Sequence, residues 1–167
     1  NAWDTRYYLN FWVVDLCGSS PQTGGVAGYS YIPATGNGLH GSNIDGIVIE
    51  YSIGMDGHVW THETGHYLGL HHTWGDLSAN ACGNVFPDTD DGFTDTPDSK
   101  EANFGCSANF SCTGNSSYGD LLEDFMDYSS CPVLFTTQQV NYMNNILTNI
   151  RSSLLNTNKC SATGSPL

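Results

Sequence analysis

The sequence has 167 residues, the length of one ordinary domain, and 39% of them are hydrophobic, which excludes wholesale disorder. Its 17 acidic residues face only four basic ones, so the formal net charge is -13 and a nucleic acid or an anionic membrane surface is excluded as a partner. No apolar run approaches the ~20 residues of a membrane span.

Residues 1–57 predict three strands separated by turns. Residues 7–14 are aromatic and β-branched, as in a largely buried strand. Residues 27–33 alternate in polarity and end in proline, which predicts a short strand at a sheet edge. Residues 46–52 predict a second buried strand.

Residues 58–72 predict a helix and its exit, and they contain the pattern HExxHxxGxxH. Side chains four apart share one face of a helix, so His62 and His66 can reach one metal ion. Gly69 can end the helix in a left-handed turn that brings His72 to the same ion. Three imidazoles with an open fourth position are typical of catalytic zinc, and Glu63 can reach a water there.

A chance or purely structural cluster of histidines is the alternative interpretation of this segment. Four of the six histidines lie within these eleven residues, with the glycine where the geometry needs it, so we favour zinc. His71 does not have the ligand spacing, and we interpret it as a packed or solvated histidine.

The remainder of the chain divides into a long loop and a helix. Residues 73–134 show almost no periodicity, so this segment must be stapled, liganded or disordered. Residues from Phe135 to about Leu155 predict an amphipathic helix with Thr136 or Thr137 as N-cap. Its apolar stripe, interpreted as core packing, comprises Val140, Met143, Ile146, Leu147, Ile150 and Leu154.

Six cysteines without a CxxC spacing favour three disulfides in a secreted protein. Buried free thiols in a cytosolic protein are the alternative. Spacing alone leaves fifteen pairings open.

The motifs together resemble the pappalysin family of metzincin metallopeptidases. In that family HExxHxxGxxH is followed by a methionine turn, for which Phe125-Met126-Asp127-Tyr128 is the candidate. The resemblance runs from about Trp3 to Leu155. Its other segments are residues 94–97 (TDTP), 103–106 (NFGC) and 135–139 (FTTQQ).

The resemblance implies an α+β fold with a small twisted mixed sheet over an active-site helix, a long disulfide-stapled loop and a C-terminal helix. We expect one catalytic domain over residues 1–167, with an upper part at about 1–72 and a lower part at about 73–167. Family domains have a further strand and helix upstream of Trp3, which this sequence does not include. We also expect a precursor whose pro-segment blocks the zinc.

The resemblance also implies site roles. The three motif histidines become zinc ligands and Glu63 the general base. Met126 becomes a hydrophobic floor beneath the metal, although ordinary core filling would explain that residue alone. Tyr128 becomes the group that stabilises the oxyanion, where packing is the simpler alternative.

Calcium is expected in the acidic loop, whose repulsion it would offset. Six aspartates lie within 23 residues, at positions 76, 88, 90, 91, 95 and 98. The resemblance favours Asp91 with the carbonyls of Thr94 and Thr96, and Asp76 as a further candidate. Asp95 can instead orient the loop, and a solvated acidic surface loop is the alternative to any calcium site.

The family pattern further implies the bonds Cys82–Cys112 and Cys106–Cys131, which leaves Cys17 with Cys160. One departure concerns specificity. Family members usually carry an acid after the methionine turn that selects basic residues, and Tyr128-Ser129-Ser130-Cys131 has none.

These inferences predict a secreted, extracellular zinc endopeptidase whose peptide or protein substrate pairs with the strand around residues 28–32. A non-catalytic binding module stabilised by calcium and zinc is one alternative. Zinc-dependent hydrolysis of a non-peptide amide or ester is another.

Overall fold

This computed structural model describes residues 2–16, 25–33, 40–52, 57–76, 82, 86–112 and 119–156. The chain forms two compact units, Asn1–Gly69 with Met143–Leu167 and Leu70–Tyr142. In the part of the chain that the structure describes, no helix is long and apolar enough to cross a bilayer.

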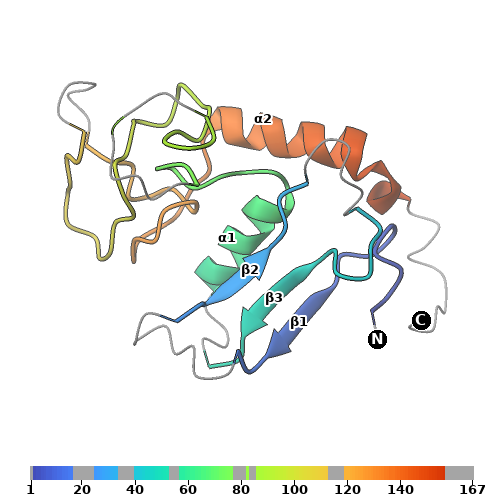
Figure 1. Ribbon diagram of the computed structural model, residues 1–167. Coiled ribbons are helices and arrows are strands. Elements are labelled where there is room, and N and C mark those ends of the chain that lie inside the picture. Colours follow the sequence, from blue (N-terminus) through green and yellow to red (C-terminus); the bar gives the residue numbers. More distant parts are fainter. Residues whose placement is uncertain are drawn as a thin grey trace. The chain divides into compact units, whose positions relative to one another are not determined.

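A small mixed sheet organises the first unit (Figure 1). Its strands are β1 (Phe11–Val14), β2 (Gly28–Ser30) and β3 (Ile47–Glu50), in the order β1-β3-β2. β3 pairs parallel with β1 and antiparallel with β2. The strand order confirms the predicted edge position of the second strand, and the third strand is buried as predicted, with Val48 only half-buried.

The prediction for the first strand was wrong in two respects. Tyr7 belongs to a turn and Tyr8 follows it, and both backbone N–H groups donate to the carbonyl of Asp4. The strand itself is not largely buried, since 39% of Phe11 and 53% of Val13 are exposed. β1 is the second edge of the sheet, where the pairing with β3 covers one side only.

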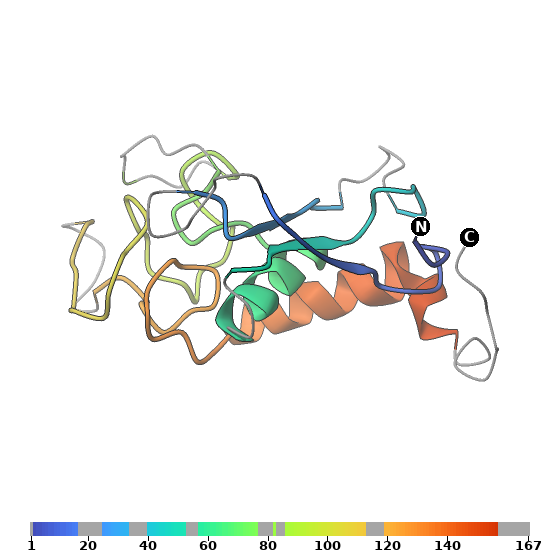
Figure 2. The ribbon, with the colours of Figure 1, turned by 90° about the horizontal axis from the view of Figure 1, so that it is seen from below.

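Helix α1 (Gly57–Tyr67) lies along one face of the sheet and contacts β2 and β3 (Figure 2). Ile47 and Ile49 of β3 project towards it, and with Tyr67 they form the buried centre of this unit. Hydrophobic burial between strand and helix therefore fixes α1 against the sheet.

The C-terminal helix is less regular than predicted. Helix α2 (Thr137–Asn145) continues into a π-helical turn, η2 (Ile146–Ile150), and a 3₁₀ turn, η3 (Ser152–Leu155). The N–H of Arg151 bonds to the carbonyl of Ile146, five residues back, which is the π-helical spacing and widens the helix at this turn. Val140, predicted as core, is 41% exposed, whereas Ile146 is buried as expected.

The second unit is mostly loop. Among its described residues before α2, the only strand-like pairing is an isolated bridge between Asp124 and Leu134. Cys82 is bonded to Cys112 and Cys106 to Cys131, as predicted. The prediction for Cys17 and Cys160 lies outside the described residues.

Candidate metal centre and active site

Helix α1 carries His62, Glu63 and His66, all three buried. The two imidazoles stand one helical turn apart on the same face, with ring centroids separated by 4.7 Å. The i, i+4 spacing therefore places both imidazoles on one face of the helix, as the sequence predicted.

The helix ends two residues before Gly69, as predicted. Gly69 has φ of 95°, a left-handed conformation that costs other residues free energy, and its N–H caps the carbonyl of His66. His72 follows this turn. The possible ligand atoms of His62, His66 and His72 all lie within 4.8 Å of one another.

Glu63 is packed against strand β2. A Cβ on Gly28 would stand 3.1 Å from Cγ of Glu63 and 2.8 Å from the carbonyl of Val48, so only glycine fits there. Ser30 donates to the backbone carbonyl of Glu63 at 2.7 Å. Burial raises the pKa of the Glu63 carboxyl to about 7, and its Oε2 is buried without a hydrogen-bond partner among the described residues. A carboxyl in this state can exchange a proton near neutral pH.

His72 sits in a small aromatic cluster of the second unit. Trp74 stacks on its ring at 4.5 Å with an interplanar angle of 4°. The hydroxyl of Tyr128 lies 3.1 Å from Nε2 of His72, and 46% of Tyr128 is exposed. The tyrosine is thus partly open to solvent, unlike the packed tyrosine that was the alternative.

Met126 is fully buried in the second unit. Its N–H donates to Asp124 at 2.7 Å, and its carbonyl accepts a bond from Thr73, the residue after His72. The methionine turn and the segment leaving the histidine motif are therefore joined through their backbones.

The candidate calcium ligands of the acidic loop differ from one another in burial and in hydrogen bonding. Asp91 is buried, and its Oδ1 accepts from the hydroxyl of Thr96 at 2.8 Å and from the N–H of Phe93. Its Oδ2 is buried with no hydrogen-bond partner among the described residues, and burial raises its pKa to about 7. Asp76 is exposed and bonded to Nδ1 of His71 at 2.8 Å.

Asp95 and Thr94 hold the start of α2. Asp95 accepts from the hydroxyl of Thr136 and from the N–H of Gln138, and Thr94 exchanges two hydrogen bonds with the Gln138 side chain. Thr136 and Gln139 form a reciprocal capping box, which confirms Thr136 as N-cap. The interpretation that Asp95 orients the loop is supported by these bonds.

Sequence reasoning missed two features of the site. Trp74 closes the motif segment, but stacking on His72 has no sequence signature. Asn103 belongs to the NFGC segment and donates two hydrogen bonds of 2.9 Å to the carboxylate of Asp127. The presence of this asparagine among the family-like segments was the only available signal.

The family model described as pregnancy-associated plasma protein-A matches residues 1–148. An extracellular metalloprotease of Colletotrichum graminicola is 33% identical over 140 residues, which are 75% of this chain and 47% of the relative. One of Podospora anserina is 32% identical over 143 residues, which are 79% and 46%. The chain thus spans about half the length of these relatives.

Two solved structures share the fold. Mature mirolysin of Tannerella forsythia, in complex with a cleaved peptide, matches with a TM-score of 0.78 at 32% identity, over 97% of this chain and 62% of that one. A mutant of promirolysin from the same organism matches with a TM-score of 0.75 at 32% identity, over 95% and 53%. The fold expected from the sequence is therefore present.

Proposed function

The chain belongs to the pregnancy-associated plasma protein-A family of peptidases, the pappalysin metzincins, and from this membership we propose that it is a zinc metalloendopeptidase acting on peptide or protein substrates. The observation that carries the proposal is the convergence of the three motif histidines beside a buried carboxyl.

The residues present fit a zinc ion. His62, His66 and His72 offer three neutral nitrogen ligands at mutual distances that one ion can bridge. When bound, zinc would polarise both a water molecule and the carbonyl of the scissile bond.

Glu63 is the proposed general base. Its free Oε2 can accept a proton from the attacking water and later deliver it to the leaving amine. The backbone of Gly28 lies next to Cγ of Glu63, and this close packing holds the carboxyl in place during both proton transfers.

Tyr128 is the proposed oxyanion partner. Its hydroxyl contacts His72 in this structure and its ring is half exposed, so rotation of the side chain can bring the hydroxyl to the substrate oxygen.

An extended peptide has a place to bind on β2. This strand is an edge of the sheet and is bonded to the backbone of Glu63 through Ser30. Main-chain pairing with β2 would give affinity without sequence preference. The missing acid after the methionine turn argues against selection of basic residues.

We also propose structural calcium at Asp91, whose Oδ2 is buried without a hydrogen-bond partner among the described residues and could bind a cation. Thr94 and Thr96 remain candidates through their carbonyls. Asp76 is a poorer candidate because it is exposed and occupied by His71.

Secretion, a single catalytic domain and a precursor with an inhibitory pro-segment are part of the same proposal. The relatives named extracellular metalloproteases support secretion, and the solved promirolysin supports the pro-segment.

The test is cleavage of quenched fluorescent peptides and of casein by the zinc-loaded protein. Glu63→Gln should retain zinc and lose at least about 100-fold in kcat. His71→Ala, which alters the adjacent histidine outside the proposed ligand set, should keep both zinc and activity.

Normal cleavage by a zinc-loaded Glu63→Gln protein would rule out the general base. A zinc-loaded wild-type protein that cleaves no peptide would instead favour the binding module, and cleavage of esters alone would favour the non-peptide hydrolase.

A further inference from the structure

The side chain of Asn103 joins two segments of the second unit that are far apart in sequence. Its backbone N–H donates to Oδ1 of Asp127 at 2.9 Å, and its Nδ2 donates to Oδ2 of the same carboxylate at 2.9 Å. Both residues are buried, at 7% and 4% exposure. Asp127 is therefore held by both of its oxygens from one residue.

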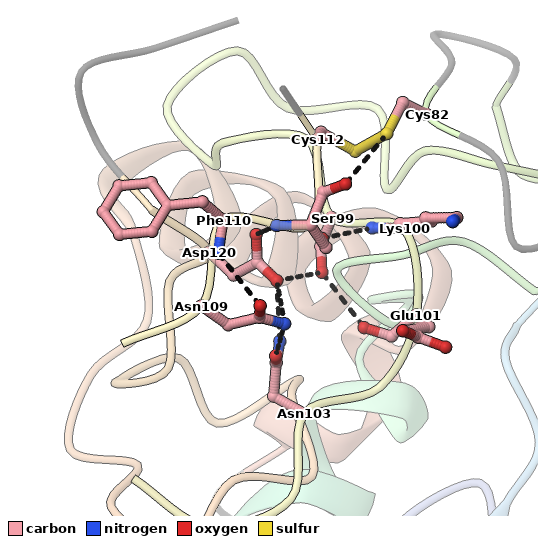
Figure 3. Close-up of a disulfide and its surroundings, with 10 residues drawn as sticks. Cys82, Ser99, Lys100, Glu101, Asn103, Asn109, Phe110, Cys112 and Asp120 are labelled. Carbon is pink, nitrogen blue, oxygen red and sulfur yellow. Dashed lines mark hydrogen bonds between the residues drawn. A yellow bond between two sulfur atoms is a disulfide. The ribbon is translucent and has the colours of Figure 1, made fainter. Parts of the chain in front are cut away.

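A second carboxylate fixes the orientation of the Asn103 amide. Figure 3 shows Asp120 between Ser99, Asn103 and Asn109, beside the Cys82–Cys112 disulfide. Nδ2 of Asn103 donates to Asp120 at 3.2 Å, and Oδ1 of Asn103 accepts from Asn109 at 2.7 Å. Both N–H groups of the Asn103 amide and one lone pair of its oxygen are thus used.

This arrangement requires an amide at position 103. Both N–H groups of Nδ2 meet carboxylates, so a carboxylate of the same shape would lack the donors and add a third negative charge. The requirement concerns donor chemistry, since the volume of the side chain would be unchanged.

Asp127 passes this constraint to the active site. Oδ1 of Asp127 also accepts the N–H of Tyr128 at 2.7 Å. Tyr128 in turn places its hydroxyl 3.1 Å from Nε2 of His72. The ring of Phe104, the residue after Asn103, lies 6.1 Å from the Tyr128 ring. The segment around Asn103 is therefore linked to the Tyr128 backbone through Asp127 and contacts the Tyr128 ring through Phe104.

We propose that Asn103 is a positioning residue for peptide hydrolysis, which acts through Asp127 to set the place of the Tyr128 hydroxyl. The inference rests on the proposed function. A displacement of about 1 Å at a catalytic group can cost about 100-fold in rate, so a fixed carboxylate behind the tyrosine has a direct effect on kcat.

The experiment compares Asn103→Asp with Ser99→Ala in the full protein, with kcat and KM measured on a peptide substrate. Ser99 donates to the same Asp120 at 3.4 Å and to the carbonyl of Glu101, and among the described hydrogen bonds it has none to Asp127. Asn103→Asp should lower kcat at least about tenfold with KM changed less than about threefold. Ser99→Ala should leave both near their wild-type values.

The decisive step repeats Asn103→Asp in a Tyr128→Phe protein. If Asn103 acts through the tyrosine hydroxyl, the substitution adds little further loss there. An equal loss of kcat in both backgrounds, or an equal loss from Ser99→Ala, would overturn the proposal.

Should Asn103→Asp not fold, the combination N103D with D127N replaces it, because exchanging amide and carboxylate restores one donor–acceptor contact between the two positions. Its kcat should then be higher than that of D127N alone, and a kcat no higher than that of D127N alone would count against the inference. A wild-type protein without peptidase activity would reject the proposed function, whereas an active one with additive variants rejects this inference alone.

Discussion

Arg151 donates from Nη1 to Oδ2 of Asp45 at 2.7 Å, and neither side chain is exposed to solvent. The same guanidinium donates from Nε to the carbonyl of Tyr67, the last residue of α1, and lies 3.5 Å above the Tyr67 ring. A buried cation therefore ties the chain after η2 to the end of the helix that carries the metal motif.

Removing the Arg151 cation should lower the free energy of unfolding. Arg151→Met leaves the buried Asp45 without its arginine cation, with only the Gly41 N–H and the His40 ring beside Oδ2, and we expect a loss of about 3–5 kcal/mol in the free energy of unfolding, measured by urea titration. Arg6→Met, which breaks an exposed pair with Asp4, is the control and should leave the midpoint nearly unchanged. Equal midpoints for the two variants would show that the buried pair does not stabilise the fold.

Gly28→Ala should damage both stability and catalysis. The added Cβ meets the Val48 carbonyl at 2.8 Å and presses on Glu63, so the strand or the catalytic carboxyl must shift. Overpacking of this kind costs about 1–3 kcal/mol, and kcat should fall with it. Gly57→Ala at the first residue of α1 meets nothing within 4 Å and serves as the matched control. If Gly28→Ala keeps full kcat, the close approach of β2 to Glu63 is not needed for activity.

Calcium should raise the melting temperature through Asp91. At 100 times the Kd, a ligand that binds only the folded state adds about 2.7 kcal/mol. Asp91→Asn should abolish the calcium-dependent rise seen by scanning calorimetry, whereas Asp88→Asn, at an exposed position in the same loop, should preserve it. If calcium still raises the melting temperature of Asp91→Asn, the calcium site does not depend on Asp91.

Asp124 should make stability depend on pH. Burial raises the pKa of its carboxyl from 3.8 to about 6, so between these values the folded state binds more protons than the unfolded state. Stability from this group is therefore greatest below about pH 4 and falls as the pH rises to about 6, by at most about 3 kcal/mol.

The measurement is urea unfolding from pH 4 to 7 with calcium removed. Asp124→Asn should flatten the fall and can keep the bond to the N–H of Met126 through its amide oxygen. Glu123→Gln, at the exposed neighbouring position, is the control. A fall that is unchanged in Asp124→Asn would assign it to another group.

Local spacing explains why the centre of the site could be predicted. His62 and His66 are placed by helical periodicity, and the left-handed turn at Gly69 needs only the absence of a Cβ. The two described disulfides and the capping role of Thr136 were also predicted, the first from family resemblance and the second from residue preference.

Contacts between distant segments could not be predicted in this way. The exposure of β1 depends on its position at the edge of the sheet. Tyr7 and Tyr8 are not part of the strand because their N–H groups bond to the carbonyl of Asp4 instead. The burial of Arg151 follows from Asp45, 106 residues away.

The sequence by itself determined that the protein is strongly acidic, because net charge depends on composition alone. It also determined the histidine motif and the glycine that ends the helix, because these depend only on residues within a few helical turns. Only the tertiary structure decided that Asn103 holds Asp127, that Gly28 confines Glu63 and that Asp95 caps α2. Each of these contacts joins residues at least 24 positions apart, and such residues meet only when burial of the surrounding core offsets the entropy of closing the loop between them.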